Sequence, residues 1–146
     1  MISIYTDAAT KGNPGPTGLG ILVVVNKKQF QLTDTISLAS NHEGEFQAAI
    51  HGFRYLTTNY SRQEVVIFHT DSQLVKDAIS KSYAKHYADE LATLLQLMDQ
   101  FETVITRWIP EKENHGAHHL ANQALRQVEW LILFPKIIAK NHENRD

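Results

Sequence analysis

The chain has 146 residues, a length typical of one domain, and 42% of them are hydrophobic, which is enough to bury a core without disulfide bonds. It contains no cysteine, so cysteine-based zinc sites, thiol nucleophiles and disulfides are excluded. The formal net charge of −2 excludes a protein that holds nucleic acid by overall charge, so any such contact must come from a local site. We expect a single domain over residues 1–146, with a polar tail from about residue 141.

The sequence shows no targeting segment and no apolar stretch long enough to span a membrane. Residues 1–9 lack the basic and apolar regions of a signal peptide. The longest apolar run, WLILFPKII at 130–138, is interrupted by Pro135 and Lys136. We therefore expect a cytoplasmic protein without membrane contact. The sequence identifies no protein partner, and we expect a monomer.

Hydrophobic periodicity predicts a mixed α/β domain. Apolar and polar residues alternate over 29–37, which is typical of a half-exposed antiparallel strand. The continuous apolar run at 64–70 instead predicts a strand buried on both faces. The resulting order, βββαβααβα, predicts a mixed sheet covered by helices. The predicted elements are strands over 2–6, 20–25 and 29–37 (the last two joined by residues 26–28), a helix from about 43, a strand over 64–70, a helix opened by Ser72, a helix with an apolar stripe from Tyr87 to Phe101, a strand over 103–109, and a last helix that begins within 113–125 and that Pro135 ends or bends.

Two predicted strands end in an aspartate, IYTD at Asp7 and FHTD at Asp71. If these strands are parallel neighbours, both carboxylates emerge at the same end of the sheet, where open α/β sheets place their sites. Glu45, at the start of the first helix, adds a third acid. Such oxygen ligands suit Mg²⁺ or Mn²⁺, and paired ions among three acids form a phosphodiester-hydrolysis site. Each residue also has a structural explanation, since Asp7 could shape a turn, Asp71 with Ser72 could cap a helix, and Glu45 favours a helix N-terminus.

Three motifs occur in one order along the chain: TDAATKGNPGPTGLG, then EFQAA, then TDSQLV. Together they resemble the type 1 ribonuclease H family over about residues 1 to 130. The resemblance implies a ribonuclease-H-like fold with a five-stranded mixed sheet flanked by helices. It also implies an endonuclease that cleaves the RNA strand of RNA–DNA hybrids with two Mg²⁺ or Mn²⁺ ions. Exonucleases and integrases of the wider superfamily match the KGNPGP loop and the TDSQ segment less closely.

The resemblance assigns roles to individual positions. Asp7, Glu45 and Asp71 match three metal-binding carboxylates, with Asp7 bridging both ions. Glu45 and the loop after Asp7 are candidates for sensing the 2′-hydroxyl group that distinguishes RNA from DNA. Asn13 and Asn41 could equally serve only in turns. The positions that match contacts to the hybrid are Lys11, Gly12, Asn13, Ser40, Asn41 and Gln73.

His118 stands where the family carries a fourth catalytic, metal-binding carboxylate. The family pattern is N-x-x-A-D-x-L-A, and this chain has NHGAHHLA at 114–121. Three outcomes are open. The imidazole could ligate an ion, with a preference shifted towards Mn²⁺; it could fail to replace the lost charge, so that the second ion binds weakly; or Glu111 or Glu113 could fold back to serve.

Other parts of the chain also depart from the family pattern. The connection at 109–114 is short, where many members carry a longer loop with a catalytic histidine, and the basic protrusion is reduced to Lys81, Lys85 and His86 within 80–90. Adjacent helical residues point about 100° apart, so a zinc site formed by His115, His118 and His119 is not expected.

Two alternatives to the enzyme remain. A chain without the fourth carboxylate could bind nucleic acid with weak or no catalysis. The domain could instead bind a partner or a second copy of the chain through the apolar segment WLILFPKII at 130–138.

Overall fold

A computed structural model describes residues 1–134, in which a five-stranded sheet is flanked by helices. No helix in this part of the chain is long and apolar enough to cross a membrane. Pro135 and the expected polar tail lie outside the described residues. The elements are β1 (Ile2–Thr10), β2 (Gly15–Val25), β3 (Lys28–Ala39), α1 (Asn41–Asn59), β4 (Val65–Thr70), α2 (Gln73–Lys81), α3 (Ala88–Met98), β5 (Thr103–Trp108), a short 3₁₀ helix η1 (Glu111–Glu113) and α4 (His115–Leu133).

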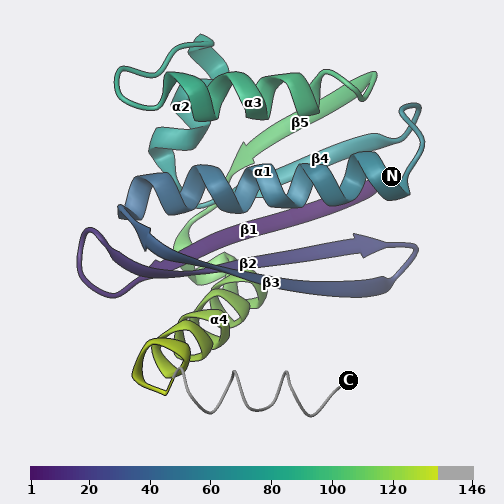
Figure 1. Cartoon of the computed structure of the whole chain (residues 1–146). Coiled ribbons are helices and arrows are strands. Elements are labelled where there is room, and N and C mark those ends of the chain that lie inside the picture. Colours follow the sequence, from purple (N-terminus) through teal and green to yellow (C-terminus); the bar gives the residue numbers. More distant parts are fainter. Residues whose placement is uncertain (135–146) are drawn as a thin grey trace.

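The sheet has the strand order β3-β2-β1-β4-β5, with β1 parallel to β4 and antiparallel to β2. Figure 1 shows α1 and α3 on one side of the sheet and α4 on the other. Large apolar side chains such as Phe46, Phe53 and Phe68 fill the layer between α1 and the sheet. The predicted order βββαβααβα and the mixed sheet are therefore confirmed.

Several predicted boundaries were wrong. β1 continues past Asp7 to Thr10, because residues up to Thr10 pair with β2. The turn between β2 and β3 has only two residues, Asn26 and Lys27, both with positive φ, and Lys28 already belongs to β3. Phe101 is buried but lies beyond the end of α3, so the apolar stripe outlasts the helix.

The strand β4 is buried on both faces only in its second half, whereas the sequence predicted burial along its whole length. Val66 and Phe68 are fully buried beneath α1, whereas Val65 is 37% exposed and Ile67 is only partly buried. The reason is the placement of α4, which packs against β1, β2 and β3 and leaves the first half of the other face of β4 uncovered, although His69 on that face is buried.

Close contact between α4 and the sheet depends on glycines in β2. A Cβ atom on Gly20 would overlap the backbone of Ala117 and Ala121, and one on Gly18 would overlap the backbone of the next turn of α4. The helix therefore lies directly on the strand backbone, and this contact fixes the position of every side chain at the start of α4.

We expect Gly20→Ala to lower the free energy of unfolding by about 1–3 kcal/mol or more, because the added methyl group meets helix backbone that cannot rotate away. Urea denaturation measures the change. Gly52→Ala is the matched control, since its Cβ would meet side-chain atoms and no backbone, the nearest being the free end of Ile4 at 2.7 Å, and alanine favours the helix. Equal losses in the two variants would contradict the close backbone contact.

Candidate active site

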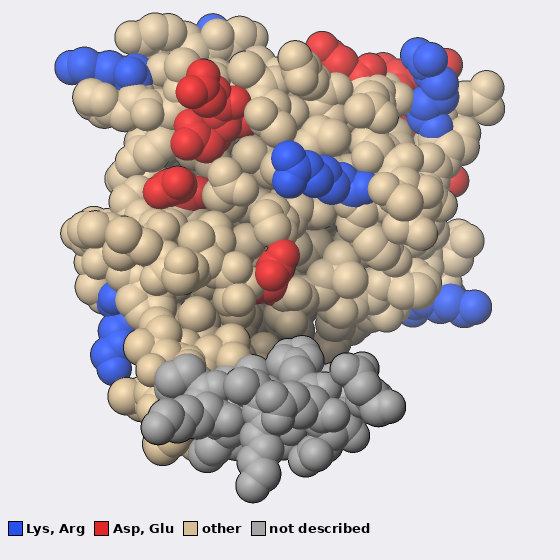
Figure 2. Space-filling model, viewed as in Figure 1, with Lys and Arg blue, Asp and Glu red and all other residues tan. Residues whose placement is uncertain are grey.

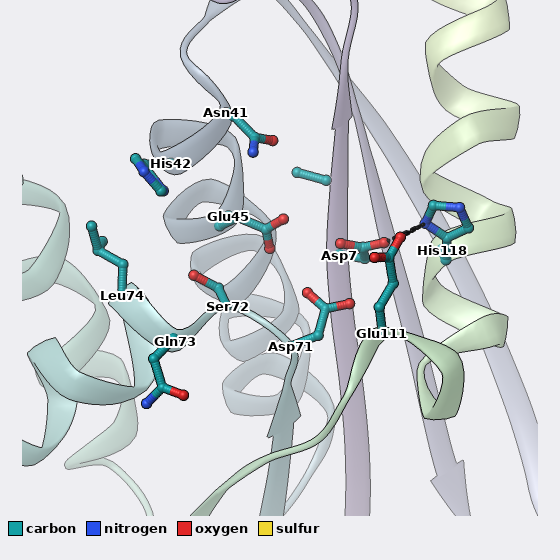
Figure 3. Close-up of a pocket in the computed structure, with 11 residues that line it drawn as sticks. Asp7, Asn41, His42, Glu45, Asp71, Ser72, Gln73, Leu74, Glu111 and His118 are labelled. Atoms are coloured by element: carbon teal, nitrogen blue, oxygen red, sulfur yellow. Dashed lines mark hydrogen bonds and ion pairs between the residues drawn. The ribbon is translucent and has the colours of Figure 1, made fainter.

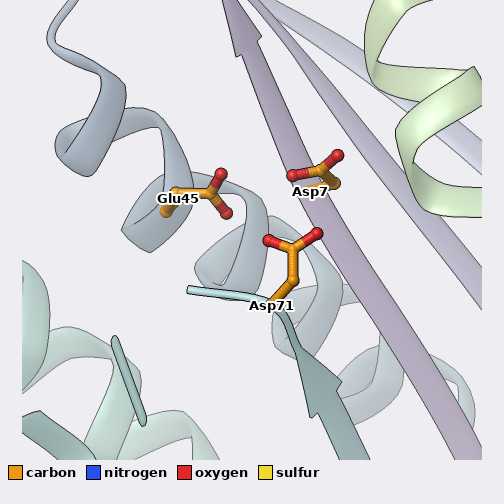
Figure 4. Close-up of side chains that lie close together, drawn as sticks. All are labelled: Asp7, Glu45 and Asp71. Carbon is orange, nitrogen blue, oxygen red and sulfur yellow. The ribbon is translucent and has the colours of Figure 1, made fainter. Parts of the chain in front are cut away.

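Three carboxylates from separate elements meet at one place. Asp7 lies in β1, Asp71 directly follows β4, and Glu45 projects from α1 (Figure 4). The parallel pairing of Thr6 with Thr70 places the two aspartates side by side. Each acid offers an oxygen that lies within 4.8 Å of an oxygen of the other two. The structure thus brings together the three acids that the sequence singled out.

Burial makes the charge of this cluster unfavourable. Asp7 and Glu45 are 4% and 8% exposed. Burial raises the pKa of Glu45 well above its usual value, and the nearby charges of Asp7 and Asp71 raise it further. Burial is also the main reason why the pKa values of Asp7 and Asp71 are raised. The cluster therefore needs a positive charge to remain fully ionised near neutral pH.

The chemistry of the cluster fits a divalent cation. Among the described residues, the side chains that line the surrounding cavity of about 410 Å³ include no Lys or Arg. Oε2 of Glu45 is buried, and it has no hydrogen-bond partner in the described part of the chain. A carboxylate oxygen without a partner, next to two other acids, is a donor set suited to a hard ion such as Mg²⁺ or Mn²⁺.

His118 reaches the cluster from the first turn of α4. Its Nδ1 lies 2.9 Å from Oδ2 of Asp7, and the imidazole is about half exposed (Figure 3). Oε1 of Glu111, on η1, lies 4.0 Å from the same nitrogen. Nδ2 of Asn122, one turn further along α4, donates a hydrogen bond to the backbone carbonyl of His118 and lies 3.1 Å from Nε2 of the ring.

Asn114 holds Asp71, a role that the sequence motif around His118 does not indicate. Its side chain is 1% exposed, and its Nδ2 donates to the backbone carbonyl of Thr6 at 2.9 Å and to Oδ2 of Asp71 at 3.1 Å. The bond to Asp71 acts against the rise in the pKa of this carboxyl. Asn114 thus joins β1, Asp71 and the start of α4, a role that depends on tertiary contacts.

The residues expected to contact the hybrid take different positions. Asn41 and Gln73 line the cavity (Figure 3). Ser40 caps α1, because its Oγ accepts a hydrogen bond from the backbone N–H of Glu43. His42, Ser72 and Leu74 also line the cavity, although none of them was among the predicted site residues, and so does Glu111, which the sequence offered as an alternative acid beside His118.

The predicted loop between β1 and β2 lies beside the start of α1. Oδ1 of Asn13 accepts a hydrogen bond from the backbone N–H of Asn41 at 3.0 Å. Gly12 has a φ of 81°, a left-handed conformation that glycine adopts readily. The exposed Lys11 ammonium lies 3.7 Å from Glu129 of α4. The roles of these residues in binding stay predictions.

Residues 5–124 match the family model described as reverse transcriptase-like. A protein of Enterococcus faecalis named "Putative hydrolase EbsB" is 40% identical over 129 residues, which cover 87% of this chain and 96% of that protein. A ribonuclease H of Pseudomonas entomophila is 39% identical over 144 residues, which cover 87% of this chain and 95% of that enzyme.

Solved structures agree with the fold. The crystal structure of RNase H1 from Halobacterium salinarum has a TM-score of 0.78 at 26% identity, covering 86% of this chain and 98% of that chain. LC11-RNase H1, solved in complex with an RNA/DNA hybrid, has a TM-score of 0.79 at 24% identity, covering 87% of this chain and 98% of that one. This second likeness supports the fold alone.

We expect Glu45→Gln to raise the melting temperature of the metal-free protein at neutral pH by roughly 3 °C or more, the shift that about 1 kcal/mol produces in a domain of this size. Because the folded-state pKa of Glu45 is raised, the fold loses stability as the pH rises from the ordinary glutamate pKa through the raised value. The gain should shrink as the pH falls below the ordinary glutamate value, where the folded and unfolded states are both protonated.

Thermal melts over a pH series, with and without Mg²⁺, measure this effect. Mg²⁺ should stabilise the wild type more than the variant, since the amide that replaces the carboxylate carries no charge. Glu102→Gln removes an exposed acid outside the cluster and should leave the melting temperature nearly unchanged. Equal gains for Glu45→Gln at acid and neutral pH would show that charge repulsion is not the cause.

Proposed function

The chain belongs to the ribonuclease H family, and we propose that it is an endonuclease that hydrolyses the RNA strand of RNA–DNA hybrids with Mg²⁺ or Mn²⁺. The observation that carries this proposal is the cluster of Asp7, Glu45 and Asp71 in an open cavity. Relatives named ribonuclease H support the choice of substrate, and LC11-RNase H1, which shares the fold, was solved with such a hybrid bound.

The three acids define how the site would hold a cation. Asp7 and Asp71 approach from neighbouring strands and Glu45 from α1, so their oxygens surround one point from different directions. Without a cation, this cluster would repel the phosphates of a nucleic acid. A bound divalent cation supplies Lewis-acid stabilisation of the charge that develops on the phosphate oxygens. Asn114 would keep the Asp71 carboxylate oriented towards that point.

Recognition of the hybrid would rely on local polar contacts. On the face shown in Figure 2, Lys and Arg side chains are scattered and do not gather into a basic patch. Asn41 and Gln73 line the cavity (Figure 3), and the amide of Gln73 donates a hydrogen bond to Asp77. The backbone of Gly12 and Asn13 can approach a sugar–phosphate chain closely, since no bulky side chain intervenes. These groups and Glu45 are our candidates for binding the RNA strand and its 2′-hydroxyl groups.

One observation favours a second candidate function. His118 occupies the corner expected to hold a carboxylate, and it bonds to an oxygen of Asp7. A site with less negative charge binds cations more weakly, so the chain could bind hybrids without cleaving them at a useful rate. Cleavage assays separate this hybrid-binding protein from the enzyme.

Wild-type protein should cleave a labelled RNA–DNA hybrid in Mg²⁺ or Mn²⁺, and Asp7→Asn should slow cleavage by roughly 100-fold or more, because the cluster loses a central charge. Gel analysis of the products measures the rate. Asp99→Asn, an exposed change at the end of α3, serves as the control and should cleave like the wild type. Hybrid binding without any turnover by the wild type would favour the second candidate.

His118→Asp should increase cleavage in Mg²⁺ by about tenfold or more, because it restores a hard oxygen ligand at the fourth corner. Single-turnover rates in Mg²⁺ and in Mn²⁺ test this, and the gain should be larger in Mg²⁺. His119→Asp adds the same charge at the neighbouring exposed position and should bring no gain. A fall in rate for His118→Asp would show that the imidazole itself serves catalysis.

A further inference from the structure

A chain of hydrogen bonds on α4 determines which nitrogen of His118 carries the proton. We propose that Asn122 is a positioning residue that holds His118 in its Nδ1–H form, so that the imidazole donates a hydrogen bond to Asp7 and does not bind the metal ion. The part of the proposal that concerns the metal rests on the proposed function. The part that concerns the protonated nitrogen does not.

The backbone carbonyl of His118 determines the orientation of the Asn122 amide. Nδ2 of Asn122 lies 3.0 Å from the backbone oxygen of His118 and 3.1 Å from Nε2 of the ring. If the amide were flipped, its oxygen would face the backbone oxygen of His118, and two acceptors would meet. A carbonyl oxygen can only accept, so it selects the orientation in which the NH₂ group faces His118.

The orientation of the amide fixes the state of the ring. Because the NH₂ group of Asn122 can only donate, Nε2 of His118 must act as the acceptor. In a neutral imidazole one nitrogen accepts and the other carries the proton, so the proton lies on Nδ1. Nδ1 then donates to Oδ2 of Asp7 across 2.9 Å, the distance of a good hydrogen bond.

Neither nitrogen is then available as a ligand. A protonated Nδ1 has no lone pair to offer, and the lone pair of Nε2 is directed at Asn122. Binding a metal through Nδ1 would move the proton to Nε2, where it would face the NH₂ group of Asn122. The second ion expected from the family resemblance would therefore receive no ligand from His118.

The donor role has a physical consequence for Asp7. A hydrogen bond donated to a carboxylate fixes which way its oxygens point and stabilises its charge. With Oδ2 of Asp7 held by His118, the carboxylate keeps one orientation towards Glu45 and Asp71. Asn122 thus acts on the metal cluster through His118, although it does not line the cavity.

Long-range ¹H–¹⁵N NMR of the histidine rings tests the proposal on the metal-free protein, at a pH above the ordinary histidine pKa. His118→Gln assigns the His118 signals. The wild type should show His118 mainly as Nδ1–H. Asn122→Leu, which removes the donor, should shift the ratio of Nδ1–H to Nε2–H by roughly fivefold, the factor that one ordinary hydrogen bond contributes. Gln123→Leu, an exposed change on the same turn, should not shift it.

Asn122→Asp provides a second test, because its carboxylate accepts a hydrogen bond at the same position and should favour the proton on Nε2. Mg²⁺ is then added to the wild type until the shifts of the Ala8 amide saturate, and the Nδ1–H signal of His118 should persist. A wild-type ring protonated mainly on Nε2, or loss of the Nδ1 proton on saturation with Mg²⁺, would overturn the proposal. If the protein cleaves no hybrid, the metal-free spectra still decide the role of Asn122.

Discussion

Repulsion among three clustered carboxylates, two of them buried and Asp71 partly buried, is the constraint on which the rest of this structure depends. Asp7, Glu45 and Asp71 would separate if they were free to do so, since burial and mutual charge both raise the pKa of Glu45. They stay together because parallel strands fix two of them and a helix packed on the core fixes the third. The stability of the hydrophobic layer thus holds acids in an arrangement that favours a cation.

The helix α4 packs on the face of the sheet opposite α1 and places His118 beside this cluster. Gly18 and Gly20 allow its backbone to lie on β2, and Asn114 joins its first turn to β1 and Asp71. Both contacts are needed to place His118 beside Asp7, because a small shift of the helix would break a hydrogen bond of 2.9 Å. The geometry of the site therefore depends on the packing of α4 on β2 as well as on the positions of the acids.

The sequence was sufficient to predict the order of the elements and the meeting of Asp7 with Asp71. Periodicity records which faces are buried, and parallel strands present their ends at one edge. The sequence could not predict that β1 continues to Thr10, because the residues after Asp7 are held by pairing with β2 and show no apolar alternation. Nor could it predict the role of Asn114, whose partners lie 43 and 108 residues away along the chain.

At position 118, histidine and aspartate would shift the pKa of Asp7 in opposite directions. A carboxylate there would add repulsion and raise the pKa of Asp7 further. The hydrogen bond from His118 instead lowers this pKa and offsets part of the rise that burial causes. The metal-free fold is therefore less strained with histidine, whereas a cation at this position would be attracted less strongly than by aspartate. The same substitution that relieves the folded protein would thus weaken the electrostatic drive for binding metal.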